Sequence, residues 1–405
     1  MKIALIAGMA LAGAAATSVV AQEAPAPTAP ATAPDVPAGA PPAVAATAPT
    51  LGPSLSGPLV ANANPISFDI PAIGKIYVSG VGSGIARFQD HSVPGDHSSY
   101  GDLSNAQVIV QKVDGVFQFY AQAGIYSLPS LGTGYLRATR ATDATYSPLP
   151  EAFIKIAPNA AFSIEVGKLP TLIGAEYTFT FENMNIDRGL LWNQEPAISK
   201  GVQANYTHGP IALSLSLNDG YYSSKYSTLS GSATYTFNPA NVLAFVASGN
   251  TKRTYKSTFS TPGILNNSEL YNLIYTYTKG KVIVQPYVQY SHVSAQPFFG
   301  TTAASTIGGA ILAKYSFTPE FSLPVRAEYI SSSGRSSATA ANLLYGSGSD
   351  AYSLTFTPTY QYKVLFARAE LSYVKATGAT PGAVFGTNGL DRSQTRGLLE
   401  VGIMF

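Results

Sequence analysis

The sequence predicts an all-β fold, a transmembrane antiparallel β-barrel of 16 strands, preceded by a disordered Ala/Pro-rich N-terminal segment. Apolar and polar residues alternate with period two along many short segments, as in strands with one face towards lipid. Short turns alternate with long polar loops between these segments. Only 11% of the residues are charged although 46% are hydrophobic, whereas soluble chains carry about 25% charged residues. No apolar run is long enough for a transmembrane helix.

The first residues have the pattern of a secretory signal peptide. Met1 and Lys2 give a short positive start, residues 3–16 form an apolar run, and small residues lead to Ala21. The run is too short to span a bilayer, and a buried core helix would need amphipathic spacing. We therefore expect residues 1–21 to direct export and to be removed.

The next segment, residues 22–65, is rich in Ala, Pro and Thr and carries only two charged residues, Glu23 and Asp35. Such a composition cannot bury enough apolar surface to offset the entropy of ordering. It predicts an extended, mobile spacer, with anchoring to the cell wall as the alternative. The outer-membrane barrel would then occupy residues 66–405.

Strands are assigned from the alternation and from short turns such as Asp114-Gly115 and Pro158-Asn159. In one example, Ile211, Leu213, Leu215 and Leu217 alternate with Ala and polar residues. Pairing the strands around the turns gives sixteen candidates, which begin near residues 75, 104, 115, 151, 161, 201, 211, 228, 242, 269, 282, 305, 321, 350, 364 and 396. An even number places both ends of the barrel on the side of the short turns.

Aromatic residues at the strand ends favour a membrane barrel over a soluble sandwich. Membrane barrels place outward aromatic rings at both water interfaces. Outward aromatics are expected at the short-turn end for Tyr206, Phe237, Tyr277, Phe317, Tyr362 and Phe405, and at the long-loop end for Tyr126, Tyr290, Tyr329 and Tyr373. Pro286, Pro324 and Pro358 conflict with continuous ladders, and we expect β-bulges at these positions.

Several segments resemble a known family. They are the run Gly167-Lys168-Leu169-Pro170 with Gly174, Glu176 and the Asn183 region, Lys200-Gly201-Val202, and the terminal Gly402 to Phe405. Together they resemble the putative β-barrel porin-2 family, the OmpL-like outer-membrane porins of Gram-negative bacteria. The resemblance implies a porin-like protein of the cell outer membrane without catalytic residues. It also implies that Phe405 ends a signal for the barrel-assembly machinery.

Other candidate chemistry has a simpler explanation. The glycines at 80, 82 and 84 follow a strand but precede no helix, so strand bending is preferred over a phosphate loop. Asp90-His91 and Asp96-His97 could hold a metal ion, but a solvated loop is preferred. The chain has no Cys and four His without the spacing of a catalytic triad. We therefore expect no enzyme activity, no metal and no cofactor.

The long connection at residues 170–199 is the main functional candidate. It combines carboxylates with one arginine and with apolar residues that a solvated loop would not need, such as Phe179 and Leu190. We interpret it as a pore-constriction loop, with a cap on the outer rim or a subunit contact as the alternative. The candidate residues of the constriction are Glu176, Glu182, Asp187, Arg188, Trp192 and Glu195.

Charged residues within the strands are expected to face the lumen, because Lys or Arg facing lipid at mid-membrane costs about 2–4 kcal/mol. These are Lys155, Glu165, Lys168, Lys314, Arg326, Glu328, Arg368, Glu370 and Glu400. Charges of both signs indicate a water-filled lumen, which sixteen strands are wide enough to enclose.

The favoured function is passive diffusion of small hydrophilic solutes through this lumen. A solute-specific channel, for example for sugars with Trp192 as a sliding surface, and a non-conducting structural or adhesive barrel are the alternatives. Expected partners are outer-membrane lipid and lipopolysaccharide, the barrel-assembly machinery, the solutes and two further copies in a homotrimer. The net charge of +2 gives no basis for nucleic-acid binding.

Overall fold

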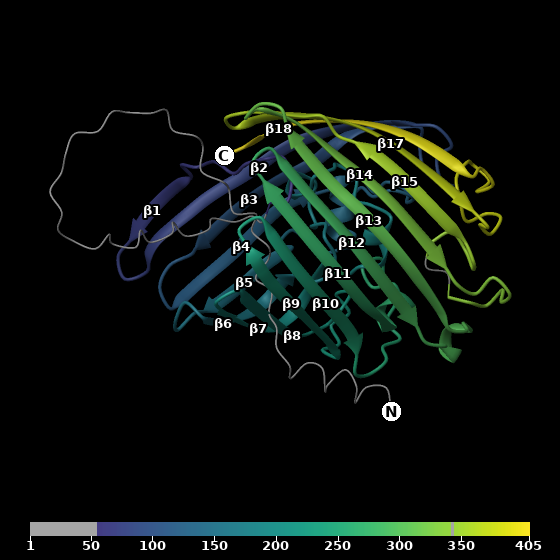
Figure 1. The fold of residues 1–405 in the computed structure, drawn as a ribbon, viewed down its shortest axis with the longest axis horizontal. Helices are drawn as coiled ribbons and strands as arrows, with labels where there is room; N and C mark the ends of the chain where they lie inside the picture. Colours follow the sequence, from purple (N-terminus) through teal and green to yellow (C-terminus); the bar gives the residue numbers. More distant parts are fainter. Residues whose placement is uncertain (1–54, 342–343) are drawn as a thin grey trace.

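The computed structural model describes residues 55–341 and 344–405, and its regular secondary structure consists mainly of antiparallel strands (Figure 1). The strands are β1 (Ile66–Ile70), β2 (Gly74–Gln89), β3 (Ser99–Lys112), β4 (Phe117–Tyr126), β5 (Glu151–Ile156), β6 (Phe162–Pro170), β7 (Ile198–His208), β8 (Ile211–Asn218), β9 (Thr228–Asn238), β10 (Asn241–Asn250), β11 (Ser268–Lys279), β12 (Val282–Val293), β13 (Ala304–Ser316), β14 (Phe321–Ser332), β15 (Asp350–Phe356), β16 (Thr359–Tyr362), β17 (Leu365–Thr377) and β18 (Ser393–Met404).

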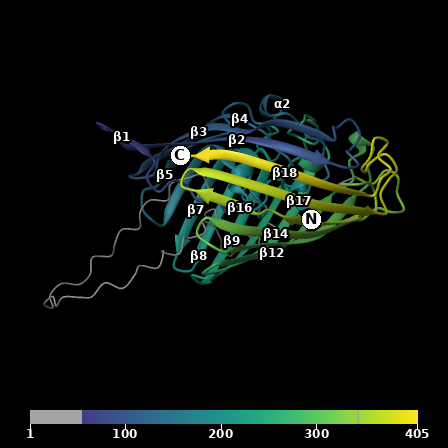
Figure 2. The ribbon, with the colours of Figure 1, turned by 90° about the horizontal axis from the view of Figure 1, so that it is seen from above.

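The sheet closes on itself because β18 pairs with β2 along nine residue pairs, from Arg396↔Gln89 to Met404↔Val81. β15 and β16 both pair with β14 and β17, so they are two halves of one barrel strand, and β1 is a hairpin extension of β2. The result is a closed barrel of 16 antiparallel strands, as the alternation predicts. The short turns and the C-terminus lie at one end, and the longer loops lie at the other (Figure 2).

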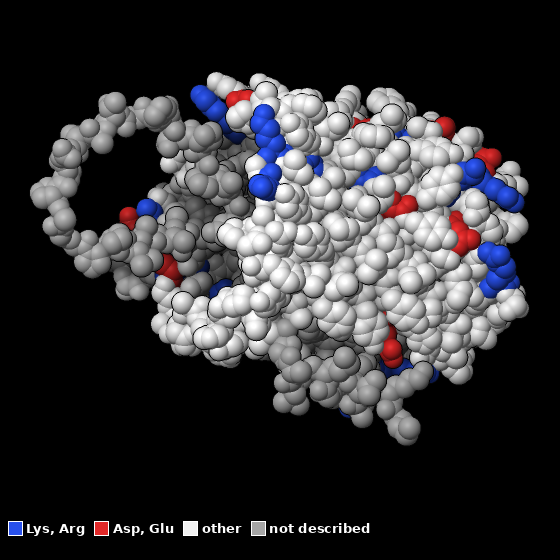
Figure 3. Space-filling view, viewed as in Figure 1, with Lys and Arg blue, Asp and Glu red and all other residues white. Residues whose placement is uncertain are grey.

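The strand register places apolar side chains outside and polar ones inside. In β17 and β18 the residues of one phase, such as Leu371 and Leu399, are more than half exposed, whereas Arg368 and Glu400 of the other phase are buried. The outer wall in view carries few charged side chains, and most of these lie towards its two ends (Figure 3). An uncharged outer band is what a lipid-facing barrel requires.

Tyr126 corrects one expectation about the aromatic positions. Most predicted outward rings are exposed, among them Tyr206, Phe237 and Tyr329. Tyr126, however, shares its face of β4 with Gln122, is fully buried and stacks edge-on against Phe179. The period-two phase of its own strand therefore turns this ring into the barrel.

None of the three prolines forms the expected bulge, and Pro324 pairs with Lys314 in an unbroken β13–β14 ladder. Pro358 separates β15 from β16, yet the pairs Phe356↔Leu371 and Thr359↔Arg368 on either side keep the same register. At Pro286 the β11–β12 pairing is also interrupted and resumes in the same register. A missing donor removes a hydrogen bond, but it does not require an extra residue.

In the part of the chain that the structure describes, helical structure is confined to the connections. It comprises α2 (Ala138–Ala144) and four short 3₁₀ helices, η1 (Thr180–Glu182), η2 (Leu191–Gln194), η3 (Leu265–Asn267) and η4 (Pro297–Phe299). Within the described ranges, no helix has the length and apolar character needed to cross a membrane.

The N-terminal boundary differs from the expected one. The predicted signal peptide and residues 22–54 of the predicted spacer lie outside the described residues. Residues 55–65 precede β1 and pack on the barrel, with Leu59 buried and Val60 held by the side chain of Gln361. The mobile spacer expected up to Pro65 therefore does not extend through these residues.

Candidate pore constriction

The connection between β6 and β7 runs inside the barrel rather than over its rim. Residues 171–197 lie between the two strands, and nearly all of them from Ile173 onward are buried. η1 and η2 give this loop two tight turns, and Glu182 closes the first by accepting the Phe179 amide at 2.9 Å. We refer to residues 171–197 as the inner loop.

Arg326 of β14 is the first anchor of the inner loop. Its Nη1 donates to Glu176 Oε1 at 2.6 Å and to the Asp187 carbonyl at 2.7 Å, and its Nε lies 3.2 Å from Glu328 Oε2. Glu176 in turn accepts the Gly189 amide at 2.8 Å. A Cβ on Gly189 would overlap the carboxylates of Glu176 and Glu328, so this position requires glycine.

Arg368 and Glu370 of β17 bind the backbone of the loop. Arg368 donates to the carbonyls of Thr180, Asn183 and Met184, each at 2.9 Å. Glu370 accepts the amides of Ile186 at 2.5 Å and Asp187 at 3.1 Å. Because these bonds reach main-chain atoms, they fix the path of the loop and not only the position of one side chain.

Glu400 and Arg396 of β18 complete the charged side of the lumen. Glu400 accepts the Thr180 hydroxyl at 2.7 Å and lies 3.4 Å from Arg368 Nη1. Arg396 Nη1 donates to Asp187 Oδ2 at 2.6 Å and to the Ser130 carbonyl at 2.9 Å. We call the inner face of β14, β17 and β18 the charged wall.

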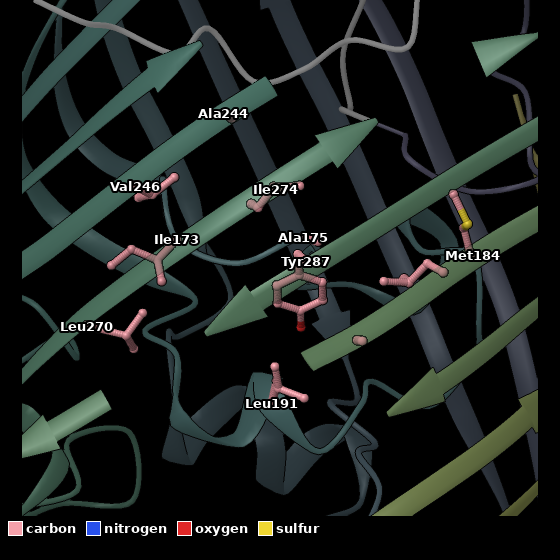
Figure 4. Close-up of a cluster of buried hydrophobic side chains, with 11 residues drawn as sticks. Ile173, Ala175, Met184, Leu191, Ala244, Val246, Leu270, Ile274 and Tyr287 are labelled. Carbon is pink, nitrogen blue, oxygen red and sulfur yellow. The ribbon is translucent and has the colours of Figure 1, made fainter. Parts of the chain in front are cut away.

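The opposite side of the inner loop packs on an apolar surface. Leu191, Ile173, Ala175 and Met184 of the loop form one buried cluster with strand residues. The strand residues, which we call the apolar wall, are Ala244, Val246, Leu270, Ile274, Tyr287, Ala310 and Leu312 of β10 to β13 (Figure 4). The inner loop thus lies between two walls of different chemistry. Its hydrophobic side chains pack on the apolar wall, as expected for a loop that carries more apolar residues than a solvated loop needs.

Two charged groups of the loop have no hydrogen-bond partner in the described structure. The Arg188 guanidinium is fully buried, lies 4.8 Å from the centre of the Trp192 ring, and has a pKa lowered to about 10 by burial. Both carboxylate oxygens of Glu195 are unpartnered, and burial together with Glu176 and Glu328 raises the pKa of this carboxyl well above its usual range. Burial therefore disfavours the charged form of Glu195.

The remaining predicted lumen charges lie apart from the inner loop's anchors. Lys155 faces inward and lies 3.2 Å from Glu165, with both side chains partly exposed. Lys314 shares the inward phase of Leu312 near the short-turn end of β13. Lys168 contradicts the expectation, because it pairs with Lys200 on the face that carries the exposed Val166 and Val202. It caps the rim and donates to the Leu149 carbonyl at 2.6 Å.

The lumen is also less wet than the mixed charges predict. Arg326, Glu328, Arg368, Glu370 and Glu400 do face inward, yet all five are buried. The inner loop covers them, so their charges are satisfied by protein groups instead of water. The lumen is drier than expected because the inner loop packs on these residues, and the alternation pattern holds no information on that contact.

Some residues of this site are missing from the sequence-based candidates. Arg396 lies at the start of a predicted strand. It shares the inward phase of Gln394, and this phase is the sequence signal that indicates a lumen-facing arginine. Arg87 of β2 is also buried, between Asp96 at 2.5 Å and the ring of Tyr100. Asp96 is thereby engaged by a strand arginine, and His91 lies 3.3 Å from Asp90. Within residues 55–341 and 344–405, no cluster of three potential metal ligands occurs.

Comparisons with known proteins agree with this architecture. A family model described as "Putative beta-barrel porin-2, OmpL-like" matches residues 75–405. A comparison with curated proteins gave no match.

Solved structures with a similar fold are outer-membrane proteins of low sequence identity. An anion-selective porin from Comamonas acidovorans is 9% identical, with a TM-score of 0.57 over 82% of this chain and 99% of that one. The outer membrane channel DcaP of Acinetobacter baumannii is 10% identical, with a TM-score of 0.55 over 84% and 99%. The trimer form of OmpT, an outer membrane protein of Vibrio cholerae, is 12% identical, with a TM-score of 0.55 over 82% and 99%. At such identities the likeness concerns the fold.

Proposed function

The chain belongs to the putative β-barrel porin-2, OmpL-like family, and we propose that it lets small hydrophilic solutes diffuse passively across the outer membrane. The observation that carries this proposal is the inner loop, which lies within a 16-strand barrel and is anchored on both walls. Barrels of 16 to 18 strands are wide enough for an aqueous channel. A loop folded inside such a barrel sets its narrowest point.

Selection in this proposal is by size and charge, without catalysis. Glu176 and Asp187 of the loop lie near arginines of the charged wall, and Lys155 and Glu165 line another part of the lumen. Fixed charges at a narrow point bias which ions pass. The carboxylates and Arg188 of the inner loop would therefore form the selective constriction.

The surroundings of the barrel follow from the same proposal. Its uncharged outer band would contact outer-membrane lipid and lipopolysaccharide, and the predicted signal peptide would direct export. The trimer form of the similarly folded OmpT makes a homotrimer the oligomer to test.

Phe405 would end the signal for the barrel-assembly machinery. Its backbone pairs with Gly80 of β2 through two hydrogen bonds of 2.9 Å, and its ring lies over that glycine. Deleting Phe405 should lower the amount of folded protein in the outer membrane, measured as the heat-modifiable band on a gel. Replacement by Tyr, which keeps the ring, is the control, and unchanged levels for the deletion would contradict the role.

A second candidate is a non-conducting structural barrel. It is favoured by the burial of the inner loop, since the loop packs against β10 to β13 on one side and β14 to β18 on the other. A sugar-specific channel with Trp192 as a sliding surface gains less support, because this ring is engaged by Arg188.

Single-channel recording of the purified full-length protein in planar bilayers tests the proposal. Stepwise conductance that scales with salt and is not blocked by sugars supports a general pore. Block by one sugar supports the specific channel. Silence of both the parent protein and variants with a loosened inner loop would overturn the porin proposal in favour of the structural barrel.

A further inference from the structure

The segment that precedes β1 contacts the tip of the inner loop from the short-turn side. Both the amide and the hydroxyl of Ser56 donate to the Glu182 carbonyl, at 2.8 and 3.1 Å. These contacts join residues 126 positions apart in the sequence. A segment with the composition of a spacer therefore reaches the candidate constriction.

Gly57 and Leu59 show that this contact is closely fitted. A Cβ on Gly57 would overlap the backbone of Asn183, so the segment approaches the loop as closely as glycine allows. Leu59 is 2% exposed and belongs to one buried cluster with Phe181, Val81 and Met404. The segment thus packs on both the loop and the barrel.

Gln361 fixes the other end of the segment. Its side chain accepts the Val60 amide at 2.7 Å and donates to the Val60 carbonyl at 2.8 Å. Gln361 lies in β16, at a short turn of the barrel. The segment is therefore tied to the rim at Val60 and to the loop at Ser56.

The loop turn at residues 180–184 is consequently held from two sides. Arg368 binds its carbonyls from the charged wall, and the segment binds the Glu182 carbonyl and covers Phe181. Arg368 is part of strand β17 of the barrel, whereas Ser56 to Val60 lie outside the sheet. The segment can therefore move away from the loop without opening the barrel, and Arg368 cannot.

We propose that Leu55 to Val60 form a latch at the short-turn end, which is the periplasmic end of outer-membrane barrels. This latch keeps the inner loop in its packed position and the pore shut. The proposal rests on the proposed porin function. Withdrawal of the latch leaves the 180–184 turn held from the charged wall alone, and this looser loop opens the lumen. The N-terminal segment then makes conduction dependent on events on the periplasmic side.

Replacement of Gly57 tests the latch in the full-length protein. Gly57→Val places a side chain against the Asn183 backbone and should expel the segment, and Gln361→Ala should weaken the hold on Val60. Loss of about two hydrogen bonds and their packing should raise the occupancy of the open state roughly tenfold. Gly101→Val is the matched control, because the nearest atom to its Cβ would be 3.9 Å away.

A disulfide provides a second test that does not depend on destabilisation. The chain has no Cys, so Ser56→Cys with Glu182→Cys introduces a single possible bond, between two residues joined by a backbone hydrogen bond of 2.8 Å. We expect the oxidised double variant to open less often than the parent protein, and reduction to restore the parent's level of opening. The two single variants should be insensitive to reductant.

The outcomes separate the latch from the porin proposal. Opening by Gly57→Val supports both, even where the parent protein is silent. A conducting parent with identical conductance in Gly57→Val, and in the oxidised and reduced double variant, overturns the latch and leaves the porin proposal standing. Silence of the parent and of every released variant overturns both.

Discussion

The two walls that hold the inner loop do so through different kinds of contact. The charged wall uses Arg326, Arg368 and Arg396, which bind defined atoms of the loop. The apolar wall offers surfaces such as Leu270 and Tyr287, which exclude water but specify few atoms.

This difference separates position from packing. Hydrophobic burial is non-directional and scales with area, so the apolar wall can stabilise the loop in several nearby positions. Charged hydrogen bonds are directional, and removing one partner leaves a buried charge. The charged wall should therefore decide where the loop lies, and the apolar wall should decide how firmly it stays there.

Arg326→Ala should give the largest effect. It leaves Glu176 and Glu328 buried without their cation, which costs about 3–5 kcal/mol for a broken buried pair. We expect faster hydrogen exchange across the inner loop and a larger conductance. Lys155→Ala breaks a partly exposed pair and should cost about 1 kcal/mol or less. Equal effects of the two variants would contradict the role of the charged wall.

Leu191→Ala should weaken the packing of the inner loop on the apolar wall, with a similar or smaller loss of stability. Leu191 is fully buried in the cluster of the apolar wall, and such truncations cost about 2–5 kcal/mol. We expect a lower midpoint of unfolding and noisier channels, with ion selectivity retained because no charge changes. Leu215→Ala, on the exposed outer face of β8, is the control. A change of selectivity in Leu191→Ala would remove the distinction between the walls.

Neutralising the carboxylates sharpens the comparison through selectivity. Changing Glu176 and Glu182 to Gln together with Asp187 to Asn keeps the size of these three side chains and removes their negative charge. The wall arginines then dominate, so reversal potentials in a salt gradient should shift towards anions. The shift should be clearest at low salt, where screening is weakest. Unaltered reversal potentials would place the permeation path away from these residues.

Much of this architecture could be predicted from the sequence, because period-two alternation reports which face of a strand meets lipid. It places all sixteen strands and the inward phase of Arg368 and Glu400. The apolar residues of the loop also indicate that it packs on a surface. What alternation cannot report is contact between distant segments, such as Asp187 with Arg396, which lie 209 residues apart.

The latch illustrates the same limit. Composition describes residues 22–65 as a spacer, and it contains no information on Ser56 meeting Glu182. The predictions for Lys168 and Tyr126 are wrong for a related reason. The rim position of Lys168 and the strand phase of Tyr126 depend on local geometry that similar residues elsewhere do not share.

The smallest predicted effect concerns Glu195, whose carboxylate makes no hydrogen bond to either wall. Its pKa is raised by burial and by Glu176 and Glu328, so the folded state holds its proton more tightly than the unfolded chain. The stability from this proton is fully present below the unfolded pKa of about 4.3 and is lost as pH rises towards and through the raised pKa. Glu195→Gln is neutral throughout. It should therefore match the parent near pH 4 and unfold at a higher temperature than the parent in alkaline buffer. Thermal unfolding in detergent across this pH range measures the difference. A constant offset between the two proteins at every pH would show that Glu195 does not titrate on unfolding.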